Sequence, residues 1–229
     1  HNFYEGFSNE IIWPLFHDLQ SLCNFDPAYW RTYCEVNAKY ADVVKAHTAP
    51  GDFVWIHDYH LMNVGAELRR RGAHSRLGFF LHIPFPSPDL FMKLPWRLSL
   101  LQALLQFDLI GFQTVVDRRN FVQCARMLVK EVQIEGSGQV MAARVGKREV
   151  RIGAFPISID FAAFQRRAGT PEVTEKAREL HRLLPGRELI LGVDRLDYTK
   201  GIPLRLKAFE NLLERYPDLR ERLSFIQVV

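Results

Sequence analysis

The stretch Glu188–Gly201, ELILGVDRLDYTKG, places two cations on a short turn between a predicted strand and a predicted helix. The run Glu188–Val193 has the length and the branched apolar residues of a strand in a parallel sheet. Apolar residues then recur at helical spacing from Leu204 to Tyr216, and Pro203 suits a first helical turn. The order of strand, turn and helix predicts an α/β fold.

The two cations of this turn are Arg195 and Lys200, which lie just before the predicted helix. Free backbone N–H groups and the positive end of the helix dipole attract an anion there. We therefore predict a diphosphate site; the alternative is a solvated basic turn in which Asp194 and Arg195 form a surface ion pair. The turn matches neither a P-loop nor a dinucleotide fingerprint, which argues against ATP hydrolysis and NAD chemistry.

The composition is that of an ordinary globular protein of one or two domains, with 229 residues, 48% hydrophobic and 24% charged. The net charge of +4 comes partly from arginine clusters such as Arg69–Arg71, which we interpret as a solvated helix face. No aromatic residues alternate with these cations, so nucleic-acid binding is not expected. No apolar run reaches about 18 residues and no signal peptide is visible, so we expect a cytoplasmic protein without membrane contact.

The cysteines are three in number and widely spaced, at Cys23, Cys34 and Cys124. An odd number at these spacings fits neither a disulfide framework nor a zinc site. We interpret them as core thiols of a protein in a reducing compartment.

Short apolar strands alternate with helical patterns along the chain, which predicts a parallel sheet. Strands are expected at 53–56, 77–81 and 107–112, followed by a hairpin around Val145–Arg148 with an exit strand. Helices are expected for the segments carrying Ile11, Ile12, Leu15, Phe16 and Leu19; after an N-cap at Asp26; through Ala66 and Leu68; from Leu90 to Leu105 with a break at Pro95; and from Phe121 to Val129.

The chain is expected to contain two unequal domains. Residues 1–165 would form an N-terminal Rossmann-like domain that lacks its start, and 166–186 a linker with a short helix. Residues 187–229 would begin a second domain with one strand, one helix and one further strand. Such a βαβ unit cannot cover both faces of its strands, so we expect a fragment of a larger two-domain protein.

Polar side chains follow two strands of the first domain, with His57, Asp58 and His60 after one and His82 after the next. Ligands of open α/β sheets bind beyond the carboxyl ends of strands, so Asp58 and His82 should reach one crevice. We interpret Asp58 as a ligand for a polyhydroxylated molecule, and His57 and His60 as core histidines bonded to backbone. A metal site of these four residues is the alternative, although helical histidine spacing and an acidic cluster are both lacking.

Four motifs occur in one order: 4–14 (YEGFSNEIIWP), 55–61 (WIHDYHL), 78–86 (GFFLHIPFP) and 195–201 (RLDYTKG). Together they resemble the trehalose-6-phosphate synthases, the retaining glycosyltransferase family 20. The resemblance implies a GT-B fold, with two Rossmann-like domains facing a cleft and the second domain truncated here. It also implies transfer of glucose from UDP-glucose, or another nucleotide-glucose, to glucose 6-phosphate, which gives α,α-trehalose 6-phosphate.

The resemblance further implies an acceptor site for glucose 6-phosphate. Tyr4 would lie near the phosphate, Trp13 would form an apolar wall for the sugar, and Asp58 would accept hydrogen bonds from sugar hydroxyls. Without the resemblance, Tyr4 and Trp13 would be interpreted as core aromatics of an early helix.

On the donor side, the resemblance implies that Arg195 and Lys200 bind the diphosphate and that His82 contacts the transferred glucosyl group. Together with Asp58 these are the expected catalytic residues. The reaction would be a front-face displacement in which the cations stabilise the leaving group, with no cofactor and no obligatory metal.

Two other functions are alternatives to the transfer of glucose to glucose 6-phosphate. A related synthase could use another acceptor such as glycerol 3-phosphate, and a non-catalytic relative could bind sugar phosphates to regulate a partner. A homo-oligomer is compatible with the sequence. The family's glycine-bearing donor loop would precede His1 and its nucleotide-binding segment would follow Val229, so we expect this stretch alone to be inactive.

Overall fold

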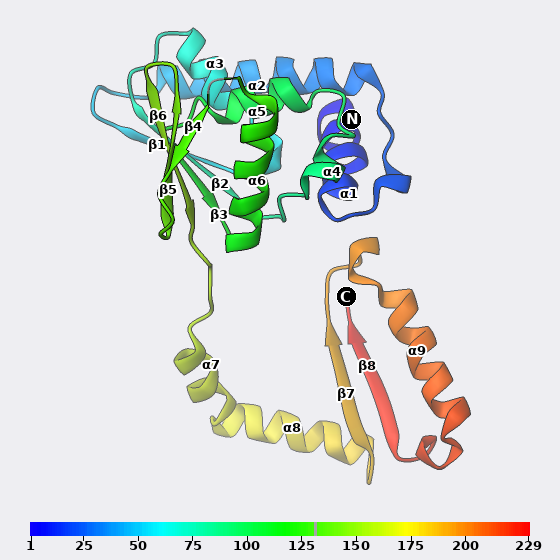
Figure 1. Cartoon of the computed structure of the whole chain (residues 1–229). Helices are drawn as coiled ribbons and strands as arrows, with labels where there is room; N and C mark the ends of the chain where they lie inside the picture. Colours follow the sequence, from blue (N-terminus) through cyan, green and yellow to red (C-terminus); the bar gives the residue numbers. More distant parts are fainter. Residues whose placement is uncertain (131) are drawn as a thin grey trace. The chain divides into compact units, whose positions relative to one another are not determined.

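A computed structural model describes residues 1–130 and 132–229 of the chain. The chain divides into two compact units, His1–Ile157 and Ser158–Val229 (Figure 1).

The first unit is built on a six-stranded sheet with the order β1-β2-β3-β6-β5-β4. Its strands are β1 (Phe53–His57), β2 (Arg76–Leu81), β3 (Leu109–Phe112), β4 (Gln133–Glu135), β5 (Val140–Val145) and β6 (Arg148–Ala154). The neighbours β1, β2, β3 and β6 pair in parallel, whereas β5 pairs antiparallel with β6 and β4 antiparallel with β5. The predicted α/β fold, parallel strands and hairpin are confirmed.

Seven helical segments of more than three residues belong to this unit among the described residues. They are the π-helix η1 (Asn2–Ile12), α1 (Trp13–Phe16), α2 (Pro27–Ala46), α3 (Val64–Arg70), α4 (Pro88–Phe91), α5 (Arg97–Leu104) and α6 (Val115–Leu128). The predicted N-cap of α2 is confirmed, because the Asp26 carboxylate accepts a hydrogen bond from Ala28 N at 2.7 Å. Short 3₁₀ turns lie at Gln20–Leu22 and Tyr59–Leu61.

The early helix was predicted with the wrong extent. Its apolar stripe is buried as expected, including Ile11, Ile12 and Phe16. However, helical structure begins at Asn2 and ends at Phe16, so Leu19 lies outside it. Asp18 adopts a left-handed backbone conformation with φ 62° and turns the chain away before Leu19.

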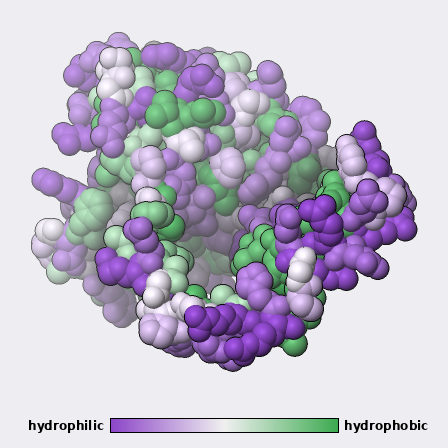
Figure 2. Space-filling model, turned by 90° about the horizontal axis from the view of Figure 1, so that it is seen from below, coloured by the Kyte–Doolittle hydropathy of each residue, from purple (hydrophilic) through white to green (hydrophobic). Residues whose placement is uncertain are grey.

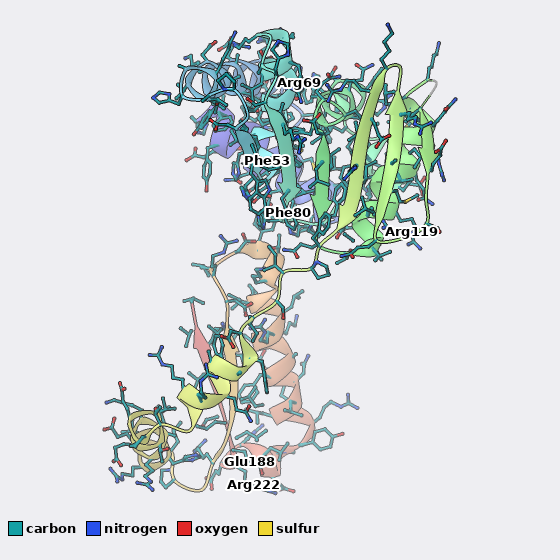
Figure 3. All side chains as sticks on the ribbon, turned by 90° about the vertical axis from the view of Figure 1, so that its left-hand side faces the viewer. Phe53, Arg69, Phe80, Arg119, Glu188 and Arg222 are labelled. Carbon is teal, nitrogen blue, oxygen red and sulfur yellow. The ribbon has the colours of Figure 1, made fainter. Side chains whose placement is uncertain are left out.

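The two faces of the sheet differ in burial. On β1, Ile56 points toward the helices and is buried, whereas Phe53 and Trp55 on the opposite face are 54% and 59% exposed. Figure 3 looks onto this opposite face, with Phe53 and Phe80 labelled and the helices of the unit behind the strands. Gly78 lies under the rings of Phe53 and Trp55, since a Cβ there would come within 2.7 Å of Phe53 and 3.5 Å of Trp55. The main core therefore lies between the other face and α2, α3, α5 and α6.

The second unit contains the predicted βαβ arrangement. Its elements are α7 (Phe161–Ala168), α8 (Pro171–Leu183), β7 (Glu188–Val193), a 3₁₀ turn (Tyr198–Lys200), α9 (Ile202–Arg215), a 3₁₀ turn (Pro217–Leu219) and β8 (Leu223–Val228). Strands β7 and β8 pair in parallel. The segment predicted as a linker with a short helix is mostly helical, because Asp160 and Thr170 cap α7 and α8 through side-chain hydrogen bonds.

The βαβ unit exposes much of its apolar surface. Within 158–229, all of which the structure describes, only Gly192 and Ile202 are buried. Leu191, Val193 and Leu204 are 66%, 65% and 74% exposed. Figure 2 shows hydrophobic residues at the surface of the face that it views. The prediction that this unit cannot cover both faces of its strands is confirmed.

No helix in residues 1–130 or 132–229 is both long enough and apolar enough to span a bilayer.

Cys23, Cys34 and Cys124 are free thiols, and Cys124 is buried while the other two are half-buried. Burial raises the pKa of Cys23 to about 11 and that of Cys124 to about 12. Cys124 is therefore a core thiol as predicted, whereas Cys23 and Cys34 are only half-buried.

Candidate functional site

The carboxyl ends of β1 and β2 bring Asp58 and His82 together, as predicted. Asp58 follows β1 directly and donates from its backbone N to Phe80 O at 2.8 Å. His82 follows β2, and its backbone N donates to Asp58 Oδ1 at 3.2 Å. These two hydrogen bonds continue the pairing of the strands past their ends. One carboxylate oxygen of Asp58 is therefore engaged by the protein, while the other oxygen, Oδ2, has no protein hydrogen bond among the described residues.

The backbone of Asp58 is strained. Its φ of 71° and ψ of 169° lie in a region that is favourable for glycine and costs other residues about 1–3 kcal/mol. Asp18 is the only other described residue besides glycine with a positive φ. Such strain persists where surrounding contacts fix the conformation, and here the two hydrogen bonds to β2 do so. The conformation fixes the direction in which the Asp58 carboxylate leaves the chain.

The interpretation of His57 and His60 as core histidines bonded to backbone is wrong. His57 is exposed, and its Nδ1 lies 3.0 Å from His82 Nε2. Its position on β1 explains this, because side chains alternate along a strand and His57 shares the exposed face of Phe53 and Trp55. Burial, followed by the charge of His82, lowers the pKa of His57, and Asp58 opposes this shift.

His60 is partly buried and is held by aromatic contacts. Its Nε2 is buried without a hydrogen-bond partner among the described residues. Its ring stacks on Tyr4 with centroids 5.2 Å apart and planes 8° apart. Burial lowers the pKa of His60, with Asp58 opposing the shift, so the neutral imidazole is favoured.

Helix α2 holds the segment that follows Asp58 through two buried polar side chains. Tyr33 donates from its hydroxyl to Tyr59 O at 2.8 Å. Asn37 donates from Nδ2 to His60 O at 3.1 Å and accepts from Asn63 N at 3.1 Å. Both side chains are fully buried. They satisfy backbone groups of the turn after β1 and keep it fixed against the helix.

The two predicted acceptor aromatics lie against this same turn. Tyr4 is 57% exposed and covers His60, so it is not the core aromatic that the bare sequence suggested. Trp13 is half-buried and lies 5.7 Å from the ring of Tyr59. Residues 57–60 thus connect Tyr4, Trp13, Asp58 and His82 into one site.

The loop that carries His82 is clamped by the first turns of α6. The backbone N of Phe85 donates to Asp117 Oδ1 at 3.0 Å, and Phe85 O accepts from Asn120 Nδ2 at 3.0 Å. Asp117 also completes a capping box with Thr114 at the start of α6. This clamp was not predicted: the T-x-x-D pattern of the capping box is visible in the sequence, but the loop residue that Asp117 binds, Phe85, is 32 residues away.

In the second unit, Arg195 and Lys200 lie on the predicted turn between β7 and α9, and both are exposed. Gly201 ends this turn in a left-handed conformation with φ 62° and directly precedes α9. Asp194 pairs with Arg205 at 2.6 Å. The suggested surface pair of Asp194 with Arg195 is therefore replaced by a pair with the helix, which leaves the carboxylate engaged away from the turn.

The described residues contain no group of three or more His, Cys, Asp or Glu side chains that could hold a metal ion. His57, Asp58 and His82 are neighbours, with His57 Nδ1 3.0 Å from His82 Nε2.

Comparison with known proteins gives a consistent result over the whole chain. A family model described as glycosyltransferase family 20 matches residues 1–229. The bifunctional trehalose-6-phosphate synthase/phosphatase of Thermoproteus tenax is 44% identical over 230 residues, which cover 99% of this chain and 30% of that protein.

Two solved structures are similar along 99% of the chain. One is an α,α-trehalose-phosphate synthase (UDP-forming) from Burkholderia xenovorans in complex with glucose-6-phosphate, with 37% identity, a TM-score of 0.89 and 50% of its own length covered. The other, from E. coli, is described as bound with UDP-2-fluoro glucose and has 38% identity, a TM-score of 0.88 and 49% of its length covered. The chain thus spans between 30% and 50% of the length of these three relatives.

Proposed function

The chain belongs to glycosyltransferase family 20, and we propose that it forms part of a retaining glucosyltransferase that makes α,α-trehalose 6-phosphate. The donor is a nucleotide-glucose, UDP-glucose in the first instance, and the acceptor is glucose 6-phosphate. Two relatives of known structure support this choice of substrates, since one is in complex with glucose-6-phosphate and the other is bound with UDP-2-fluoro glucose. The proposal covers the complete protein that contains this chain.

The observation that carries the proposal is the grouping of Tyr4, Trp13, Asp58 and His82 around one turn at the carboxyl end of β1. An exposed tyrosine hydroxyl suits the phosphate, and the half-buried indole of Trp13 offers an apolar wall to a sugar. Oδ2 of Asp58 is the oxygen that accepts a hydrogen bond from a sugar hydroxyl, because Oδ1 is bound to His82 N at 3.2 Å.

On the donor side, Arg195 and Lys200 bind the diphosphate. Both are exposed on a turn that leads through Gly201 into a 14-residue helix, α9. A helix N-terminus favours an anion, and two cations increase the attraction. His82 contacts the transferred glucosyl group of the donor, although it belongs to the same unit as the proposed acceptor residues.

The transfer is a front-face displacement. The bond between the glucosyl C1 and the diphosphate oxygen breaks, and a bond from C1 to the acceptor oxygen forms on the same face. The acceptor proton passes to the departing diphosphate oxygen. Arg195 and Lys200 stabilise the charge that develops on that group, so no metal is obligatory in the proposed reaction. A covalent route through Asp58 would use a second carboxylate as acid and base, and no other carboxylate of the motifs pairs with Asp58.

The proposed setting is the cytoplasm, where free thiols such as those of Cys23, Cys34 and Cys124 persist. The proposed partners are the two small-molecule substrates. Nucleic acid and membrane are not among them, and a homo-oligomer remains compatible with the proposal.

A product assay with an acceptor panel tests this function. The complete protein is incubated with UDP-glucose and, in separate reactions, glucose 6-phosphate or glycerol 3-phosphate, and the products are identified by mass spectrometry. We expect trehalose 6-phosphate and UDP from the first reaction, and loss of that product in Asp58→Asn. Product from glycerol 3-phosphate alone would assign the related synthase, and binding of glucose 6-phosphate without any transfer would assign the non-catalytic relative.

A further inference from the structure

His57 and His82 face each other across the ends of β1 and β2. His57 is the last residue of β1, and its register partner on β2 is Phe80, two residues before His82. Side chains two apart on a strand share a face, so both imidazoles stand on the face opposite the helical core. His57 Nδ1 lies 3.0 Å from His82 Nε2, and the ring centroids are 5.3 Å apart.

Each imidazole also rests on an aromatic ring of its own strand. The ring centroid of His57 lies 4.4 Å from that of Trp55, and the ring centroid of His82 lies 4.7 Å from that of Phe80. These contacts restrict rotation of both side chains. The main chain of His82 is fixed as well, through its hydrogen bond to Asp58 Oδ1. The pair is thus held at its backbone, at its ring faces and at its facing nitrogens.

Two facing ring nitrogens at hydrogen-bond distance must share one proton. Two lone pairs would repel, and two N–H groups would clash, so one nitrogen donates and the other accepts. If His57 Nδ1 donates, His82 carries its own proton on Nδ1; if His82 Nε2 donates, its Nδ1 is an acceptor. In either case the contact ties the tautomer of His82 to that of His57, so that both rings carry their proton on Nδ1 or both on Nε2, whereas an isolated neutral imidazole exchanges independently.

Few charged groups compete with this contact. The cavity next to the pair has a volume of about 520 Å³ and is lined mainly by aromatic and aliphatic residues, among them Trp55, Phe80 and Phe155. His57 and His82 are the titratable side chains among its lining residues. Asp58 is the neighbouring charge, and it engages the backbone of His82. The facing nitrogens therefore define the protonation of each other.

We propose that His57 is a positioning residue for His82, which it holds in one ring orientation and whose tautomer it couples to its own through the Nδ1 to Nε2 hydrogen bond. This inference rests on the proposed function for its consequence. A ring that contacts a sugar hydroxyl through Nδ1 must present there either a donor or an acceptor, and the proton position on His57 changes together with that choice. His57 itself does not touch the substrate in this proposal.

The direct test uses the wild-type protein labelled with ¹⁵N at histidine. We expect the ¹⁵N shifts of the two rings to report the same tautomer, both protonated on Nδ1 or both on Nε2, and a scalar coupling between His57 Nδ1 and His82 Nε2 across the hydrogen bond. Different tautomers in the two rings, or no coupling, would overturn the proposal. This measurement needs no variant and no substrate.

Variants then separate positioning from general structural support. His57→Phe removes the hydrogen bond, and we expect the His82 shifts to move to those of an unpaired imidazole. His57→Asn keeps a hydrogen-bonding atom where Nδ1 was, because both are bonded to Cγ, and should return the His82 shifts toward the wild-type values. His74→Asn is the matched control, an exposed histidine just before β2, and should leave the His82 spectrum unchanged. Identical His82 spectra in wild type and His57→Phe would contradict the proposal.

Kinetics of the complete protein give the functional arm. A neutral hydrogen bond contributes about 0.5–1.5 kcal/mol, so His57→Phe should lower kcat roughly 2- to 10-fold while the KM for glucose 6-phosphate stays the same. His57→Asn should recover most of the loss. If the spectra change as expected but the wild type transfers no glucose, the pairing stands and the proposed function fails. If transfer occurs and His57→Phe leaves kcat at the wild-type value, the positioning role fails.

Discussion

The two units of this chain differ in how firmly they hold their proposed site residues. In residues 1–157, buried polar side chains of α2 and α6 fix the backbone around Asp58 and His82. In residues 158–229, Arg195 and Lys200 stand exposed on a turn of a unit in which only Gly192 and Ile202 are buried. The first unit has a preorganised site and a closed core on one face of its sheet. The second has a local motif with little packing beneath it.

The two proposed sites therefore depend on different kinds of contact. Sites of the first kind require long-range contacts, such as Asn37 to His60 O and Asn120 to Phe85 O. The basic turn requires only local features, namely Gly201 in a left-handed conformation and the start of α9. Substitutions should therefore act on the first site through stability and geometry, and on the second mainly through charge.

The largest expected effect comes from the core of the first unit. Phe121 is fully buried, and its ring lies 5.3 Å from Phe85 and 5.2 Å from Phe112. Phe121→Ala should lower the free energy of unfolding by about 3–5 kcal/mol, because it leaves a cavity. The comparable change in the second unit, Phe225→Ala, should cost roughly 0.5–2 kcal/mol, since Phe225 is half-buried.

Denaturant unfolding followed by two probes distinguishes the units. The 4 tryptophans all lie within residues 1–157, so fluorescence reports the first unit while circular dichroism reports both. Phe121→Ala should shift the fluorescence transition, and Phe225→Ala should shift only part of the dichroism signal. Equal shifts of both signals by both variants would mean that the two units unfold as one.

A smaller effect is expected from the backbone strain at Asp58. Glycine accepts φ 71° without strain, so Asp58→Gly should be more stable than Asp58→Ala by roughly 1–3 kcal/mol. Both variants lack the carboxylate and should bind glucose 6-phosphate equally weakly. Thermal unfolding compared with calorimetric titration of the acceptor separates the two contributions. Equal stability of the two variants would show that the strained conformation is not retained in solution.

A modest pH dependence of stability should arise in the first unit. Burial lowers the pKa of His60, and burial together with the charge of His82 lowers that of His57. A histidine with a lowered pKa contributes stability that is present above its ordinary pKa of 6.5 and is lost as the pH falls below that value. His60→Phe should therefore make the fluorescence transition less sensitive to acid between about pH 8 and about pH 5. A transition in this variant as sensitive to acid as in wild type would assign the dependence to other groups.

The smallest effect concerns the thiols, which all lie in the first unit. With the pKa of Cys23 raised to about 11 and that of Cys124 to about 12, the thiolate fraction at neutral pH is very small. A thiol reagent should label neither cysteine in the folded protein and both in denaturant. Labelling without denaturant at the rate of a free thiol would show that the first unit opens more readily than its packing indicates.

Much of the fold follows from local patterns in the sequence. The strands of the parallel sheet, the hairpin, the Asp26 cap and the strand, turn and helix at 188–215 were predicted because each has a signal within a few residues. The extent of the early helix was not, because the left-handed backbone at Asp18 gives no apolar signal. The helices at 161–183 were missed in part because their polar composition resembles that of a linker.

The grouping of the proposed site residues was predictable more than the contacts that hold them. The carboxyl ends of two strands located Asp58 and His82, and motif likeness added Tyr4 and Trp13. The pairing of His57 with His82 was not foreseen, although the alternation of β1 already placed His57 on the exposed face with Trp55. The contacts of α2 and α6 with the segments that follow β1 and β2 join residues that are distant in sequence. No local pattern predicts such contacts.

The most direct test of the central claim is a steady-state comparison of donor-side and acceptor-side variants in the complete protein. If Arg195 and Lys200 hold the diphosphate, each makes charge-assisted hydrogen bonds of about 1.5–3 kcal/mol. Arg195→Ala and Lys200→Ala should then lower kcat roughly 10- to 100-fold even at saturating UDP-glucose, because charge builds on the leaving group. Arg195→Lys should recover part of the loss. Asp58→Asn serves as the matched variant, which should raise the KM for glucose 6-phosphate and leave UDP binding unchanged. Near-wild-type turnover in both alanine variants, or equal loss of donor and acceptor affinity in Asp58→Asn, would contradict the account.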